Sequence, residues 1–150
     1  CSLPRQKLFF WLLLQDRLNT RDLLSRKNFY VETSKCELCD DEPNEHLMHL
    51  FFSCDFSQNF WMNIGYQWDT DYNLMEMLLE GRKQDTYGCF KECLIAGCWS
   101  LWKHRNSIIF DHKVKDMAYC KAMFKKHFSM IIKKAKPGLK EGMQSWLDHL

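Results

Sequence analysis

Apolar side chains recur along this chain at the three- and four-residue intervals that are typical of α-helices. The segment PRQKLFFWLLLQDRL, which begins at Pro4, places Leu8, Trp11 and Leu12 at helical spacing. The segment is too apolar on all sides for a surface helix, and a proline suits the first helical position. We therefore predict a buried first helix that begins at Pro4.

A second, short helix is expected in the segment NTRDLLSRKNF. Asn19 or Thr20 can cap its start. Asp22 in its first turn and Arg26 and Lys27 in its last turn each suit the nearer end of the helix dipole. A helical hairpin therefore precedes the region that is rich in cysteine.

Two further short helices are predicted after that region. Phe56, Phe60 and Ile64 recur at every fourth position, and Gly65 lies where such a helix would stop. The segment YNLMEMLLEG has the same periodicity, and we expect Gly81 to end it.

The two longest patterns lie in the second half of the chain. One runs from near Tyr87 to Phe110 without a proline, and Gly97 is its only weak point. The other covers residues 117–136, and Pro137 with Gly138 is expected to end it. Its predicted inward side chains are Tyr119, Met123, Phe128 and either Ile131 or Ile132.

No segment alternates apolar and polar residues for long, so at most a short β-hairpin is expected near the cysteines. The predicted fold class is mainly α: a compact helical domain with a small zinc-binding loop. We divide the chain into a helical domain, residues 1–112, and a basic helical extension, residues 113–150, that packs on it.

The composition narrows the class of protein. A chain of 150 residues that is 46% hydrophobic is long enough for one domain with a sizeable core. It begins with Cys1 rather than Met, so we expect a piece of a longer parent. It is also larger than the small secreted scaffolds that depend on disulfides, which favours intracellular thiols in the nucleus or cytoplasm. The run LFFWLLL lacks a cleavage site and is too short to cross a bilayer.

Charge is distributed unevenly. Residues 37–80 hold ten acidic side chains and no Lys or Arg, whereas residues 113–136 hold eight Lys and the single Asp116. Residues 1–35 carry seven basic and three acidic side chains. A polyanion would therefore meet the two ends of the chain rather than its middle.

The segment CELCDDEPNEHLMHLFFSC has the spacing of a zinc site. Cys36 and Cys39 form a C-x2-C pair, at which one tight turn presents two thiolates to the same ion. His49 and Cys54, with four residues between them, supply the second pair. His46 competes with His49 on one face of a helix expected to begin near Pro43, and we favour His49 because its distance to Cys54 is more usual. Core thiols with two surface histidines are the alternative.

The zinc is expected to be structural, because four ligands leave no open position for chemistry. Glu45 beside a histidine is a weak candidate for a general base. Cys89, Cys93 and Cys98 with His104 could suggest a thiol nucleophile, but their helical spacing among apolar residues indicates buried cysteines. We predict that the domain is not an enzyme and takes no small-molecule substrate.

With these ligands placed, residues Pro4 to Trp61 resemble the reverse-transcriptase zinc-binding domain of plant non-LTR (LINE-type) retrotransposons. The shared order is the apolar opening segment, C-x2-C, the HLFFSC element and a downstream Trp. WKHRNSIIF also resembles a helical segment that often follows. The resemblance implies a place downstream of a polymerase, sometimes upstream of an RNase H domain. Its zinc ligands fall on Cys36, Cys39, His49 and Cys54.

The resemblance suggests binding of RNA or DNA, although the acidic middle of the chain would repel a phosphate backbone. The candidate phosphate contacts are Lys121, Lys125, Lys126, Lys133 and Lys134. The alternative is that these lysines only form the solvated face of an amphipathic helix. The alternative function is a protein-interaction module or domesticated adaptor. For that function, aromatic side chains left outside the core would form the binding patch. The candidates are Trp61, Tyr66, Trp68, Trp99 and Trp146. No membrane contact is expected.

Overall fold

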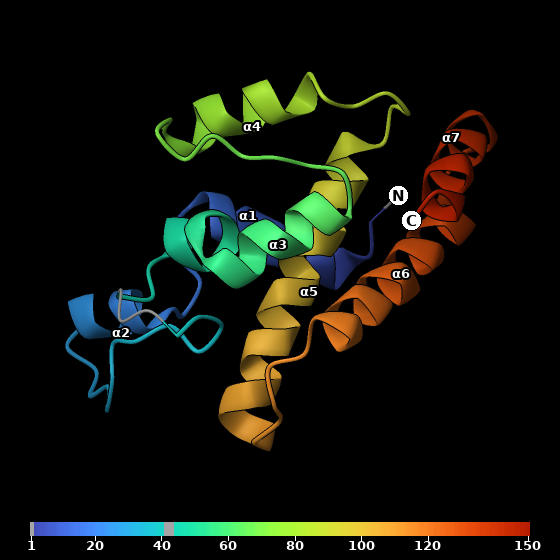
Figure 1. The fold of residues 1–150 in the computed structure, drawn as a ribbon. Coiled ribbons are helices and arrows are strands. Elements are labelled where there is room, and N and C mark those ends of the chain that lie inside the picture. Colours follow the sequence, from blue (N-terminus) through green and yellow to red (C-terminus); the bar gives the residue numbers. More distant parts are fainter. Residues whose placement is uncertain (1, 41–43) are drawn as a thin grey trace.

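The computed structural model describes residues 2–40 and 44–150, which fold mainly into helices (Figure 1). No strand occurs within these ranges, where only an isolated antiparallel bridge joins Lys35 to Asn44 near the cysteines. The mainly α fold class is therefore confirmed. The elements are α1 (Pro4–Leu14), α2 (Arg21–Arg26), the π-helical turn η1 (His49–Ser53), α3 (Asp55–Asn63), α4 (Leu74–Arg82), α5 (Phe90–Asp111), α6 (Met117–Lys134) and α7 (Pro137–Asp148).

The long helix α5 is the scaffold of the fold. Helices α1 and α6 and the turn η1 all pack on it, while α3 also contacts α6, and α7 follows α6 (Figure 1). Helix α5 can serve this role because eleven of its side chains or backbone positions are buried along its length. The segment with the cysteines is consequently held between α2 and the middle of the molecule.

A tight contact between α3 and α5 fixes the centre of the core. The indole of Trp61 is fully buried, and its Nε1 donates to the carbonyl oxygen of Phe51 at 2.7 Å. A Cβ atom at Gly97 would lie 2.3 Å from Cη2 of that indole. Gly97 is therefore the position at which α5 admits the ring, and its low helix propensity is compensated by close packing.

The first helix is less buried than its apolar sequence predicts. Gln6, Phe9 and Leu13 are buried, but Leu8 is 60% and Trp11 50% exposed. The prediction of a wholly buried helix was wrong because α1 covers only one side of α5 and η1. Its other side is left to the solvent.

The predicted inward face of α6 was correct for Phe128, Ile131 and Ile132 and wrong for Tyr119 and Met123. Tyr119 is 41% exposed, whereas Cys120 and Phe124 are fully buried together with Phe128 and Ile131. The first half of the helix therefore turns Cys120 and Phe124 inward, each one residue after the predicted position. Phe124 and Phe128 pack against Trp146 of α7, which fixes the observed face.

Two helix ends differ from expectation, and one further helix was not predicted. Helix α4 runs one residue past Gly81, which is buried against the Trp68 ring instead of ending the helix. Helix α6 ends at Lys134, and Pro137 takes the first position of a further helix, α7. A proline suits that position because its missing N–H would have no helical partner there.

None of the helices in the part of the chain that the structure describes is both long and apolar enough to cross a membrane.

Candidate metal centre

The first two candidate ligands lie in a tight turn after α2. Cys36 is buried and Cys39 is half-buried, and between them the side chain of Leu38 is fully buried in the core. The backbone N–H of Leu38 donates to Sγ of Cys36 at 3.4 Å. The turn is thus anchored by one apolar side chain while both thiols are directed to the same point.

A π-helical turn presents the second pair. The N–H of Cys54 donates to the carbonyl oxygen of His49 at 2.8 Å, an i to i+5 hydrogen bond. In an α-helix, side chains five residues apart would diverge by about 140°, since each residue adds about 100°. The wider turn brings His49 and Cys54 to the same side. Leu50, Phe51 and Phe52 between them are fully buried and tie the pair to the core.

The four side chains converge on one point. The candidate ligand atoms of Cys36, Cys39, His49 and Cys54 all lie within 4.8 Å of one another. Sγ of Cys39 is 3.3 Å from Nε2 of His49, and Sγ of Cys36 is 4.0 Å from Sγ of Cys54. In a tetrahedral zinc site, Zn–S bonds near 2.3 Å separate neighbouring sulfurs by about 3.8 Å. The cluster therefore fits zinc in both its donor set and its size.

The local electrostatics favour a thiolate at Cys54. A hydrogen bond from the Cys36 thiol lowers the pKa of Cys54 to about 4, aided by His49 and by backbone N–H groups of Ser57 and Phe56, against the opposing effect of burial. Cys54 also stands at the N-terminal end of α3, where helix N–H groups attract negative charge. The same hydrogen bond and burial raise the pKa of Cys36. One thiol of this pair is thus ready to bind a cation.

His46 lies outside the cluster. Its side chain is exposed, and its Nδ1 accepts a hydrogen bond from the backbone N–H of His49 at 3.2 Å. The two imidazole rings are 6.1 Å apart. His46 therefore stabilises the start of η1, while His49 faces the cysteines. The helix start expected near Pro43 lies outside the described residues.

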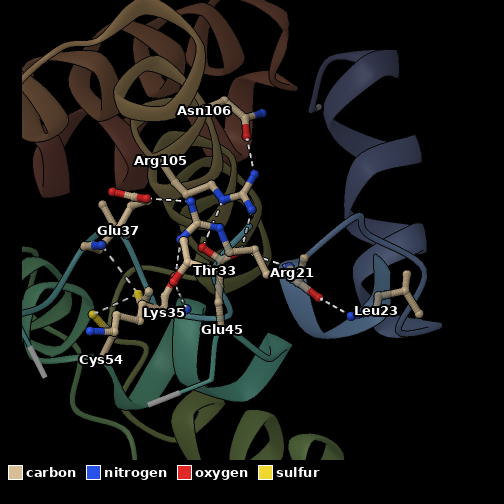
Figure 2. Close-up of polar contacts among 12 residues, drawn as sticks. Arg21, Leu23, Thr33, Lys35, Glu37, Glu45, Cys54, Arg105 and Asn106 are labelled. Atoms are coloured by element: carbon tan, nitrogen blue, oxygen red, sulfur yellow. Dashed lines mark hydrogen bonds and ion pairs between the residues drawn. The ribbon is translucent and has the colours of Figure 1, made fainter. Parts of the chain in front are cut away.

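Two ion pairs support the cluster from outside, and sequence reasoning missed both (Figure 2). Nη2 of Arg21 lies 2.5 Å from the carboxylate of Glu37, next to Cys36. Arg105 of α5 binds both carboxylate oxygens of Glu45, with Nε at 3.1 Å. Neither arginine had a pattern that could identify its partner, because the pairs join residues 16 and 60 positions apart.

These pairs change the picture of the acidic middle segment. Glu37, Glu45 and Asp40 are each paired with a cation from another part of the chain, the last with Lys115 at 3.0 Å. The segment around the cysteines is therefore partly neutralised rather than uniformly negative. Glu45 is fully buried and bound to Arg105, so its carboxylate is not placed to act on a metal-bound water.

The remaining cysteines pack in the core. Cys89 and Cys93 are fully buried with their sulfurs 3.6 Å apart, and Cys98 and Cys120 are also fully buried. Burial raises the pKa of Cys93, Cys98 and Cys120, which keeps them as thiols. His104 lies on the same helix, but its Nε2 accepts from the backbone N–H of Asp116 at 3.1 Å. These groups do not form a nucleophile with a base.

The lysines of α6 are distributed around its solvent side. Lys126, Lys133 and Lys134 are exposed, while Lys121 and Lys125 are half-buried at one edge of the helix. Nζ of Lys121 donates to the side-chain oxygen of Asn63 in α3 at 3.0 Å. The five side chains thus form a broad basic surface rather than a single row.

Comparison with known proteins bears on the N-terminal part of the chain. Residues 1–61 match the model of the family described as zinc-binding in reverse transcriptase. The match includes all four residues of the cluster and ends at Trp61. It confirms the resemblance to a reverse-transcriptase zinc-binding domain over that segment, while the plant LINE-type origin stays a prediction, and zinc is the cofactor that such a family binds. Neither the curated proteins nor the solved structures gave a significant match.

Proposed function

We propose that residues 1–61 are a zinc-binding domain of reverse-transcriptase origin. We also propose that the chain has a non-catalytic role, the binding of RNA or DNA. The zinc ion holds the segment from Cys36 to Cys54 in place, and the lysines of α6 contact phosphates. The observation that carries this proposal is the complete set of three thiols and one imidazole, four donors within 4.8 Å, in the matched segment.

The donor set supports a structural role for the zinc. Four protein ligands fill a tetrahedral site, whereas a catalytic zinc keeps a position open for water or substrate. Cys36, His49 and Cys54 are buried, so little room is left for a substrate. When bound, the ion would supply folding free energy to a turn that has few apolar side chains of its own.

The basic surface of α6 supports nucleic-acid binding. Its lysines project from a helix anchored to α5 and α7, so the charges are held on a rigid support. Phosphate contacts dominate the affinity of most nucleic-acid-binding proteins and make that affinity depend on salt. The pairing of Glu37, Glu45 and Asp40 with cations reduces the repulsion of a phosphate backbone by the rest of the molecule.

A salt titration tests the proposal. We expect the purified chain to bind a labelled single-stranded RNA and DNA with an affinity that falls steeply as salt rises. The double variant Lys126→Glu/Lys133→Glu should weaken binding at low salt and flatten the salt dependence. Native mass spectrometry on the same preparation should find one zinc per chain in the wild type and in this variant.

A lysine outside α6 supplies the control. Lys83 at the end of α4 is exposed and pairs with Glu80 of the same helix at 2.6 Å. Lys83→Glu should leave nucleic-acid affinity close to the wild-type value. Equal losses in both variants would show only a nonspecific charge effect and would count against α6 as the surface.

A protein-interaction role is the second candidate, and one observation favours it. Helices α1, α4 and α5 enclose an apolar hollow of 410 Å³ lined in part by Phe10, Leu14, Met75 and Leu79. The side chains of Met75 and Leu79, both in α4, are more exposed than those of core residues. A chain with one zinc and no measurable affinity for nucleic acid at low salt would favour this adaptor role.

A further inference from the structure

We propose that a hollow between the segment after α2 and the second half of α5 binds an unpaired nucleobase of a single-stranded nucleic acid. This inference rests on the proposed function, and it adds to that function a place and a chemical class of ligand. The α6 lysines would hold the backbone by charge, whereas this hollow would hold a base by stacking.

The hollow has a volume of 520 Å³ and is lined by both segments. Tyr30, 92% exposed, lines it from the segment after α2, and Phe110, 70% exposed, lines it from α5. Trp102 of α5 is half-buried and also lines the hollow. The volume lies within the range of about 300–1,000 Å³ that is usual for small-molecule sites. Three aromatic rings in one lining favour a flat ligand.

Exposed aromatic rings are the main argument for a stacked base. Tyr30 and Phe110 contribute little to the core, because most of their surface remains in water. Base stacking on such rings is sequence-tolerant, since every nucleobase has a π-face. Trp102 is already held in place by Arg105, whose guanidinium carbon lies 5.0 Å from the centroid of the indole ring. Stacking on a fixed ring costs less conformational entropy than stacking on a free one.

The charges of the hollow favour an uncharged base over a phosphate. Both arginines in its lining are neutralised, Arg21 by Glu37 and Arg105 by Glu45 (Figure 2). The carboxylate of Glu32 also lines the hollow and would repel an anion. The lining with its paired groups is therefore net negative by one charge at neutral pH.

A polar group in the lining can recognise the edge of a base. The side-chain oxygen of Asn106 accepts from Nη1 of Arg105 at 3.0 Å, as Figure 2 shows. This bond fixes the amide and leaves its nitrogen as a donor of two hydrogen bonds. An amide next to aromatic rings suits a heteroaromatic ligand better than an aliphatic side chain of a peptide.

A lysine outside the hollow can pair with the phosphate backbone of the bound nucleic acid. Lys103 is exposed on α5, three residues before Asn106 and seven before Phe110, so the three side chains share one face of the helix. Lys103 forms no salt bridge with the residues that the structure describes. A hollow of net negative charge, with an exposed lysine on the same face of α5, complements a neutral base joined to an anionic backbone.

The test compares a short oligo(dT) with an abasic strand of the same length, by fluorescence anisotropy at low salt. The wild type should bind oligo(dT) more tightly. Tyr30→Ala and Phe110→Ala should each weaken oligo(dT) binding about tenfold, the effect expected for a lost stacking ring. Both variants should leave the abasic strand and the slope of affinity against salt unchanged. Tyr30→Phe and Phe110→Tyr, which keep a ring, should restore wild-type binding.

Tyr72→Ala is the matched control, because Tyr72 is an exposed aromatic residue just before α4 and outside the hollow. It should bind both strands as the wild type does. Unchanged oligo(dT) affinity in both alanine variants, or equal wild-type affinity for the two strands, would overturn the base site while leaving the nucleic-acid function standing. Failure of the wild type to bind either strand would remove the proposed function and this inference together. Thermal melting and zinc content confirm that each variant is folded.

Discussion

The carboxylate of Glu45 and the guanidinium of Arg105 form a bidentate ion pair with side chains only 0% and 5% exposed. Oε1 of Glu45 also accepts from the backbone N–H of Arg21 at 3.1 Å. The backbone carbonyl oxygen of Glu45 accepts from the N–H of Asp22 at 3.1 Å. Glu45 lies four residues before His49. One residue therefore connects the candidate zinc segment to the start of α2 and to α5.

Breaking this pair from one side should be costly. Arg105→Met leaves the carboxylate of Glu45 buried without its cation, and we expect the free energy of unfolding to fall by about 3–5 kcal/mol. The double variant Glu45→Gln/Arg105→Met removes both charges and should recover a large part of that loss. Urea denaturation followed by tryptophan fluorescence measures all three proteins.

An exposed pair serves as the comparison. Lys83 and Glu80 are 70% and 48% exposed in α4, and pairs of this kind contribute about 0–1 kcal/mol. Lys83→Met should therefore change the free energy of unfolding far less than Arg105→Met. Similar small losses in both single variants would show that the buried pair is not a significant connection between the segments.

A second prediction concerns the glycine that admits Trp61. Gly97→Ala places a methyl group 2.3 Å from the indole ring, so the ring or α5 must shift. Overpacking of this kind costs about 1–3 kcal/mol and here outweighs the gain in helix propensity. We expect a lower midpoint of urea unfolding with an unchanged slope.

Gly138→Ala is the matched substitution, because a Cβ at Gly138 in α7 meets nothing within 4 Å. It should leave stability unchanged or raise it by up to about 1 kcal/mol. If Gly97→Ala proves as harmless as Gly138→Ala, the contact between α3 and α5 is looser than the packing distance indicates.

The periodicity of the sequence predicted most of the helices, but not which side of each would be covered. The second helix follows from local chemistry, and the structure selects Thr20 over Asn19 as its N-cap. The inward face of α6 depends on Trp146 of α7, a partner that no local pattern reveals. The exposed side of α1 has the same cause, since nothing in the described residues covers Trp11.

The candidate site, too, could be predicted from the sequence only in part. The spacing of Cys36, Cys39, His49 and Cys54 is local information, and the structure brings these four side chains together. Arg105 was invisible because its partner lies 60 residues away. The expected surplus of aromatic rings was placed on the wrong residues. Trp61, Tyr66 and Trp146 are buried and Trp68 and Trp99 half-buried, whereas Tyr30 and Phe110 are exposed.

A third prediction concerns removal of the metal. Chelation of zinc should loosen the segment from Cys36 to Cys54, because little apolar burial holds its first half. Since Glu45 lies within that segment, the loss should spread to α2, and amide hydrogen exchange should accelerate in both. Exchange in α6 and α7 should change less, because these helices also pack on each other, as Phe128 does on Trp146.

Two cysteine variants separate metal loss from a general effect of losing a thiol. Cys39→Ser should bind zinc much more weakly and reproduce the exchange pattern of the chelated protein. Cys120→Ala removes a buried thiol of α6 outside the cluster and should retain one zinc per chain. Unchanged exchange between Cys36 and Cys54 after complete removal of zinc would contradict a structural role for the ion.

The last prediction concerns the buried imidazole of His104. Burial lowers its pKa, and the charge of Lys113 acts in the same direction, against the opposing effect of Asp116. In the unfolded chain, a histidine takes up a proton near pH 6.5, whereas in the folded protein His104 does so only at lower pH. Between these two values the unfolded state binds more protons, so stability falls as pH falls.

His104→Gln keeps an acceptor for the backbone N–H of Asp116 but cannot titrate. At pH 7.5 we expect the variant to be less stable than the wild type, because the packing of the ring against Phe56 and Tyr119 is lost. As pH falls below about 6.5, the wild type loses stability because His104 is protonated more readily in the unfolded chain, and the variant does not. The difference in the free energy of unfolding between the two should therefore narrow. His149→Gln, at an exposed position, is the comparison for the loss of a histidine outside the core. Urea unfolding at several pH values measures the differences. A difference in stability between wild type and His104→Gln that is constant with pH would show that His104 does not remain neutral in the fold.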